Sequence, residues 1–82
     1  MPNKTSSSNI TIANILKRSD ELKNISDTPR LDIEIILAYV LGKDRTYLYI
    51  WPDLYLSCTQ QSKFNQLFSH RLLGKPIAHI TE

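Results

Sequence analysis

Residues 28–42 read TPRLDIEIILAYVLG, and this stretch decides the fold. Thr28 suits a helix N-cap, Pro29 suits the first helical position, and Gly42 suits a left-handed C-cap. Between these signals, one helical face carries Ile33, Ile36, Leu37, Val40 and Leu41, and the nearly opposite face carries Leu31, Ile35 and Ala38. A helix that is apolar on two sides is normally buried among others, so the stretch predicts the central helix of a bundle. Its β-branched residues make a strand the alternative, but the cap signals and a length of about 13 residues favour a helix.

Two further helices are predicted next to this central helix. The apolar stripe of the first contains Ile12, Ile15, Leu16, Ser19 and Leu22. Its helical period predicts a helix over about residues 10–24. After the central helix, Asp44 can cap a short helix over residues 45–51, and Pro52 should end it because the residue before a proline disfavours helical angles.

The last long helix is predicted over about residues 58–73. Ser57 and Gln60 have the spacing of a capping box at its start, and Gly74 is the expected stop. Its apolar stripe contains Phe64, Leu67, Phe68 and Leu72. After Pro76 the chain is expected to be extended.

These elements predict an all-α domain: a small bundle of four or five helices with an extended C-terminal connector. We expect residues 1–9 to be a flexible leader, residues 10–74 to form the bundle, and residues 75–82 to lead away from it. A chain of 82 residues makes one domain at most.

Charged side chains are balanced and dispersed along the chain. Ten Lys and Arg oppose eight Asp and Glu, and this mixed pattern indicates a solvated surface, so no direct nucleic-acid partner is expected. The longest strongly apolar stretch, residues 33–41, is about half the length of a bilayer span, so no membrane partner is expected. Residues 1–9 lack the apolar core of a signal peptide, and the lone Cys58 allows no internal disulfide, which fits a reducing cytoplasm.

Side chains that could carry chemistry are few and scattered. His70, His79 and Cys58 do not have metal-ligand spacing, so we interpret the histidines as a surface and a linker residue and the thiol as a bystander. Asp32 and Glu34 point about 200° apart on a helix and cannot share a substrate atom; the helix dipole explains acids in the first turns.

Neither a phosphate loop nor an obvious stacking platform is present in the sequence. The two glycines, Gly42 and Gly74, both stand at helix ends, whereas a nucleotide or cofactor loop needs clustered glycines after a strand. The aromatic residues of the segment that follows the central helix are Tyr47, Tyr49, Trp51 and Tyr55. A platform for single-stranded nucleic acid needs interleaved basic residues, and only Arg45 is near. We therefore favour core packing for these rings, with some tyrosine exposed at a protein interface.

Three stretches resemble one known family. They are residues 28–42, quoted above, residues 44–49 (DRTYLY) and residues 71–81 (RLLGKPIAHIT). In this order and spacing they are similar to the N-terminal domain of the protein-(glutamine-N5) methyltransferases of the HemK/PrmC type. The resemblance covers about residues 11–82, and it departs from the family at Glu82, where a glycine is usual.

The resemblance implies a two-domain enzyme. In that family a helical N-terminal domain helps to hold a class I peptide chain release factor, and a Rossmann-like C-terminal domain binds S-adenosylmethionine. The catalytic domain methylates the glutamine of the release factor's Gly-Gly-Gln motif. The family's catalytic Asn-Pro-Pro-Tyr is absent here, because no proline of this chain follows an asparagine.

We therefore expect a non-catalytic release-factor-recognition domain. Residues 75–82 would begin the connector to a missing catalytic domain, and this chain would hold no catalytic, cofactor or metal residues. S-adenosylmethionine would belong to the parent enzyme, and the sequence does not indicate which face binds the partner. The alternatives are a free-standing helical nucleic-acid-binding or adaptor domain and, least favoured, a small enzyme in its own right.

Overall fold

The computed structural model describes residues 10–76, and they form an all-α bundle, as the sequence predicts. The elements are α1 (Ile12–Leu16), the 3₁₀-helix η2 (Lys17–Leu22), α2 (Pro29–Leu41), α3 (Arg45–Ile50) and α4 (Cys58–Leu72). The expectations for the leader, for His79 and for the extended tail after Pro76 lie outside the described residues.

The first helix differs from its prediction as one α-helix over residues 10–24. The α-helical part has five residues, and the chain then winds more tightly as η2. A 3₁₀-helix has three residues per turn, so Leu16, Ser19 and Leu22 lie along one line. Leu16 and Leu22 are buried and Ser19 is half-buried, so the tighter winding directs this line into the bundle.

The predicted helix ends are largely confirmed. Gly42 ends α2 in the left-handed conformation, with φ of 70°. Asp44 caps α3, because its carboxylate accepts a hydrogen bond from the Tyr47 N–H at 3.2 Å. Ser57 and Gln60 form the capping box of α4. Thr28 stands at the N-cap of α2, but its hydroxyl caps no helix N–H and instead donates to Asp32 at 3.2 Å.

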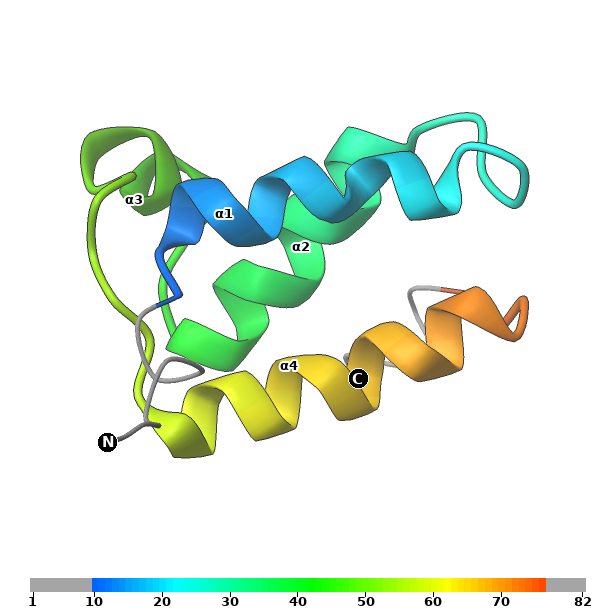
Figure 1. Ribbon diagram of the computed structural model, residues 1–82. Helices are drawn as coiled ribbons and strands as arrows, with labels where there is room; N and C mark the ends of the chain where they lie inside the picture. Colours follow the sequence, from blue (N-terminus) through cyan, green and yellow to red (C-terminus); the bar gives the residue numbers. More distant parts are fainter. Residues whose placement is uncertain (1–9, 77–82) are drawn as a thin grey trace.

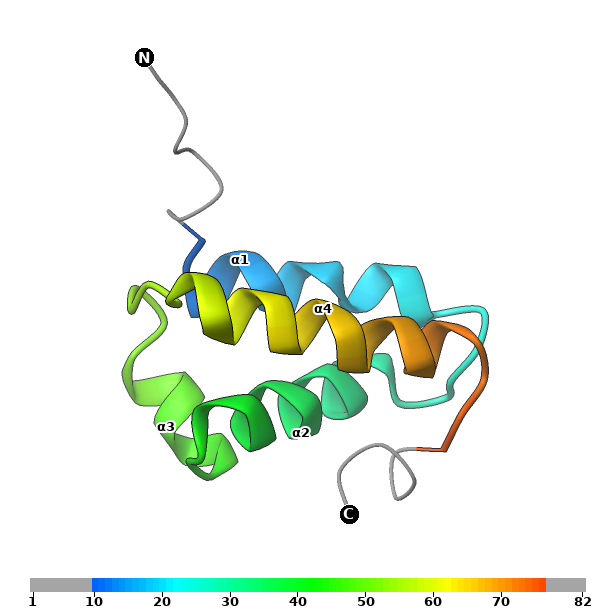
Figure 2. The same ribbon diagram turned by 90° about the horizontal axis from the view of Figure 1, so that it is seen from below.

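Helix α2 is the central element and packs against every other helix. In Figure 1 α2 lies between α1 with η2 and α4, whereas the turned view in Figure 2 shows α2 to one side of α1 and α4, with α3 at the same end of the bundle in both views. The buried core contains Ile12, Ile15, Leu16, Leu22, Ile33, Ile36, Leu37, Ala38, Leu48, Leu56, Phe64 and Phe68. Phe64 and Phe68 are buried and stack with ring centroids 5.2 Å apart, and Leu67 and Leu72 pack against the core partly buried, which confirms the predicted stripe of α4.

The segment after α3 is fixed to the start of α1 by backbone hydrogen bonds. The Ile12 N–H donates to the Leu54 carbonyl at 3.0 Å, and the Leu56 N–H donates to the Ile10 carbonyl at 2.9 Å. Paired backbone groups of this kind hold a short irregular segment in one position. They therefore place the residues that follow α3 beside α1.

Candidate partner-binding surface at the end of the bundle

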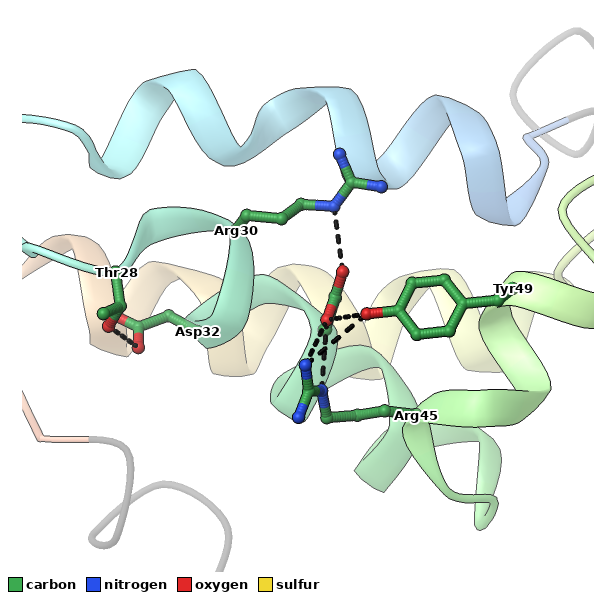
Figure 3. A network of polar contacts seen from close by, with 6 residues as sticks. Thr28, Arg30, Asp32, Arg45 and Tyr49 are labelled. Carbon is green, nitrogen blue, oxygen red and sulfur yellow. Dashed lines mark hydrogen bonds and ion pairs between the residues drawn. The ribbon is translucent and has the colours of Figure 1, made fainter.

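The carboxylate of Glu34 joins α2 to α3. Only 3% of this side chain is exposed, and its oxygens accept hydrogen bonds from Tyr49 Oη at 2.6 Å and Arg45 Nε at 3.1 Å. Arg30 Nε donates to the other oxygen at 3.0 Å. Figure 3 shows Arg30, Arg45 and Tyr49 converging from two helices. The network fixes the orientation of α3, which has only six residues of its own.

The charges of this network stabilise one another. Burial alone raises the pKa of the Glu34 carboxyl, but hydrogen bonds from Tyr49, Arg45 and Arg30 outweigh it, so the pKa lies below its ordinary value. The hydrogen bond to Glu34 is the main cause that raises the pKa of Arg45. Glu34 is therefore an ionised, partnered carboxylate at neutral pH.

A second ion pair joins α2 to α4. Arg71 Nε donates to Asp32 at 3.0 Å, and both side chains are largely buried. The sequence-based explanation of Asp32 and Glu34 by the helix dipole is therefore incomplete, because each carboxylate is buried against an arginine from another element. Their predicted divergence is consistent with the structure, since the two share no partner.

The aromatic residues after α2 are mostly on the surface, so the predicted core packing is wrong for the cluster as a whole, although the prediction allowed for some exposed tyrosine. Tyr49 is 54% exposed, Trp51 52% and Tyr55 62%, and Tyr47 is half-buried. Helix α3 is too short to bury more than one side, and Leu48 is its only buried residue. We call the exposed apolar residues here the α3 corner: Tyr49, Ile50, Trp51, Leu54 and Tyr55.

A shallow groove of about 330 Å³ lies between α1 and the α3 corner. It is lined by Ala13, Leu16, Lys17, Arg30, Leu48, Tyr49 and Pro52. Most of this lining is apolar, and the basic side chains are Lys17 and Arg30. A hydrogen bond of 2.9 Å from the Ala13 N–H to the Pro52 carbonyl holds its two sides together. Sequence reasoning missed this groove, because its lining comes from three separated stretches: residues 13–17, residue 30 and residues 48–52.

The other residues considered from the sequence lie elsewhere and do not converge. Cys58 is exposed at the start of α4, whereas His70 lies in its last turn, with Nδ1 3.1 Å from Lys75 Nζ. Gly42 and Gly74 both end helices with positive φ. Within residues 10–76, no three potential ligands gather into a metal site, and no helix has the length and hydropathy needed to cross a membrane.

Comparison with known proteins gives one consistent family. The family model of the PrmC N-terminal domain matches residues 15–81. The release factor glutamine methyltransferase of Aliivibrio fischeri is 40% identical over 73 residues, which are 87% of this chain and 26% of that protein. The enzyme of the same name from Shewanella oneidensis is 43% identical over 73% of this chain and 21% of its own length. The enzyme from Coxiella burnetii is 42% identical over 76% of this chain and 22% of its own length. This chain thus spans about a quarter of the length of these relatives, and no solved structure matches it significantly.

Proposed function

This chain belongs to the family of PrmC N-terminal domains, and we propose that it is the release-factor-recognition domain of a glutamine methyltransferase. The observation that carries the proposal is the family match over residues 15–81, together with relatives named for acting on release factors. In this proposal residues 10–74 form the recognition bundle, and residues 75–82 begin a connector to a catalytic domain.

The parent enzyme would methylate the side-chain amide of the glutamine in the Gly-Gly-Gln motif of class I peptide chain release factors. A separate catalytic domain would bind S-adenosylmethionine, which supplies the methyl group. The helical domain would hold another part of the release factor, so that the glutamine is delivered to the cofactor in the correct orientation. Its binding energy would be supplied without contact with the reacting atoms. The enzyme would act in the cytoplasm, where translation terminates.

The residues that the structure describes do not fit S-adenosylmethionine. A cofactor loop of the expected kind needs glycines between a strand and a helix, where backbone N–H groups can approach the ligand. Gly42 and Gly74 each follow a helix instead, and the elements of residues 10–76 are helices. We therefore assign recognition, and no step of the methyl transfer, to this domain.

A nucleic-acid-binding domain is the second candidate, because Tyr49, Trp51 and Tyr55 are exposed and could stack on bases. Arg45, the basic residue of α3, is engaged with Glu34. Arg45 is therefore a poor phosphate ligand, and the exposed rings suit a protein interface better.

Titration of the isotope-labelled chain with a class I release factor tests the proposal. The chain has a surface of 5043 Å², of which a standard interface would cover about 800 Å². If the catalytic domain also binds the release factor, this domain supplies only part of the contact. The entropy cost of association must still be offset by that partial contact, so the isolated domain should bind weakly. We expect a dissociation constant above about 10 μM.

One result of this titration would contradict the shared contact, and another would contradict the proposal itself. Sub-micromolar binding would mean that this domain supplies the affinity alone, without a contribution from the catalytic domain. The absence of binding at about 1 mM, where even a contact worth only about 4 kcal/mol is detected, would remove the recognition role.

A further inference from the structure

We propose that the groove between α1 and the α3 corner receives an apolar side chain of the release factor, with a carboxylate beside it on the rim that carries Lys17 and Arg30. This inference rests on the proposed function and adds the surface and the chemistry of the contact. The α3 corner would provide the surrounding apolar area.

The apolar half of the site is exposed and adjoins the groove. The α3 corner adjoins a groove lined by Ala13, Leu16 and Leu48, and Tyr49 belongs to both. Large contiguous apolar patches with a polar rim usually mark an interaction site on a monomeric protein. Tyrosine and tryptophan are the residues that most often anchor protein interfaces.

The site is preorganised for binding. Tyr49 is held by its hydrogen bond to Glu34, and Leu54 accepts a backbone hydrogen bond from Ile12. Less conformational freedom is then lost when a partner binds, which favours affinity from a small contact.

The charged half of the site is the rim formed by Lys17 and Arg30. Lys17 is exposed and forms no ion pair within residues 10–76. Arg30 is 59% exposed and reaches Glu34 through Nε, so its terminal nitrogens have no partner in the described part of the chain. Figure 3 shows the Arg30 guanidinium directed toward the first helical segment. Lys17, the C-cap of α1, lines the same groove as Arg30. A carboxylate placed here gains charge-assisted hydrogen bonds from two cations.

The surrounding charges favour a single carboxylate over a polyanion. Asp44 and Asp53 are exposed on either side of α3, so a nucleic-acid backbone that followed the α3 corner would meet two negative charges. Lys43 lies over the Tyr47 ring at 5.4 Å, and Arg45 is paired with Glu34. The cations that remain available lie together at the groove, which suits one acidic residue next to an apolar one.

Three variants of the chain test the inference by titration with a class I release factor. Lys17→Glu reverses the rim charge and should weaken binding about three- to tenfold, because one exposed pair is lost and a repulsion replaces it. Trp51→Ala removes the largest ring of the α3 corner and should weaken binding about tenfold or more. Lys23→Glu is the matched control: it makes the same charge change at an exposed residue beyond the far end of η2, and its affinity should stay within about twofold.

The outcomes separate the inference from the proposed function. Helix content measured by circular dichroism checks that each variant is folded. If all three variants bind as tightly as the unchanged chain, the release factor uses another face, and the inference is overturned while the proposed function stands. If the unchanged chain does not bind at about 1 mM, both fail. Binding of a single-stranded oligouridine that Trp51→Ala abolishes would assign this surface to nucleic acid and overturn the inference.

Discussion

Replacing Glu34 by glutamine tests the network that holds α3 on the bundle. Glutamine keeps the size of the side chain, but it removes the charge and places an amide N–H₂ against donors from Arg30, Arg45 or Tyr49. A hydrogen bond to a charged group contributes about 1.5–3 kcal/mol. Both arginines are about half exposed and can be hydrated after the change. We therefore expect Glu34→Gln to lower the free energy of unfolding by about 2–3 kcal/mol at pH 7 rather than by the sum of three bonds.

The lowered pKa of Glu34 determines how the stability difference between the unchanged chain and Glu34→Gln varies with pH. The pKa of Glu34 is lower in the folded chain than its ordinary value of 4.5, so the unfolded state takes up a proton first on acidification. The stabilisation by the charge is fully present above that ordinary value and is lost as the pH falls through the folded pKa. The difference in unfolding free energy between the unchanged chain and Glu34→Gln should therefore be constant from pH 7 to about 5 and shrink below that.

Urea denaturation followed by circular dichroism between pH 7 and pH 3 measures this difference. The whole domain is expected to have a free energy of unfolding of roughly 4–12 kcal/mol, so the variant should still fold. Asp53→Asn, which changes an exposed carboxylate, is the control and should shift stability by less than about 0.5 kcal/mol. A difference that stays constant down to pH 3, or grows on acidification, would contradict the reasoning.

Three further predictions follow from the core, a helix end and the cofactor. Phe68 is 1% exposed and stacks on Phe64, so Phe68→Ala should lower the free energy of unfolding, measured by urea denaturation, by about 3–5 kcal/mol. The control Leu73→Ala, at a 79% exposed position, should lower it by less than about 0.5 kcal/mol. An unchanged midpoint for Phe68→Ala would contradict the buried stripe. Gly42→Ala places a Cβ at φ of 70° with no atom within 4 Å, so it should cost only the backbone strain of about 1–2 kcal/mol, and a much larger loss would reveal an unseen clash. Calorimetric titration with S-adenosylmethionine should show no saturable heat; binding at micromolar concentrations would disprove the assignment of recognition alone.

The helix ends and the central helix could be predicted because their signals are local. Gly42, Asp44 and the Ser57–Gln60 pair act on backbone groups within four residues, so the sequence shows both partners of each contact. Thr28 was the exception, because Asp32 offers its hydroxyl another partner.

The site could not be predicted because its contacts join distant stretches. Glu34 is 11 positions from Arg45, and Asp32 is 39 positions from Arg71, so helical spacing reveals neither pair. The exposure of the α3 corner depends on how many sides of a short helix other elements cover, which the aromatic content of the segment does not show.

The ion pairs of the two buried carboxylates also give a physical meaning to the three stretches that resemble the family. Asp32 and Glu34 belong to the first stretch, Arg45 to the second and Arg71 to the third. Removing Arg45 or Arg71 would leave a buried carboxylate with one partner fewer, which is costly because the carboxylate is shielded from water. The resemblance therefore coincides with the residues that join α2 to α3 and to α4.

The central claim is that the α3 corner of this domain contacts a release factor. Trp51 is the only tryptophan of the chain and lies within that corner, so replacing it by 5-fluorotryptophan gives one ¹⁹F NMR reporter at the proposed interface. We predict that titration with a class I release factor shifts this signal saturably, with a dissociation constant above about 10 μM. A signal whose chemical shift stays unchanged while the chain is bound to the release factor would contradict the claim.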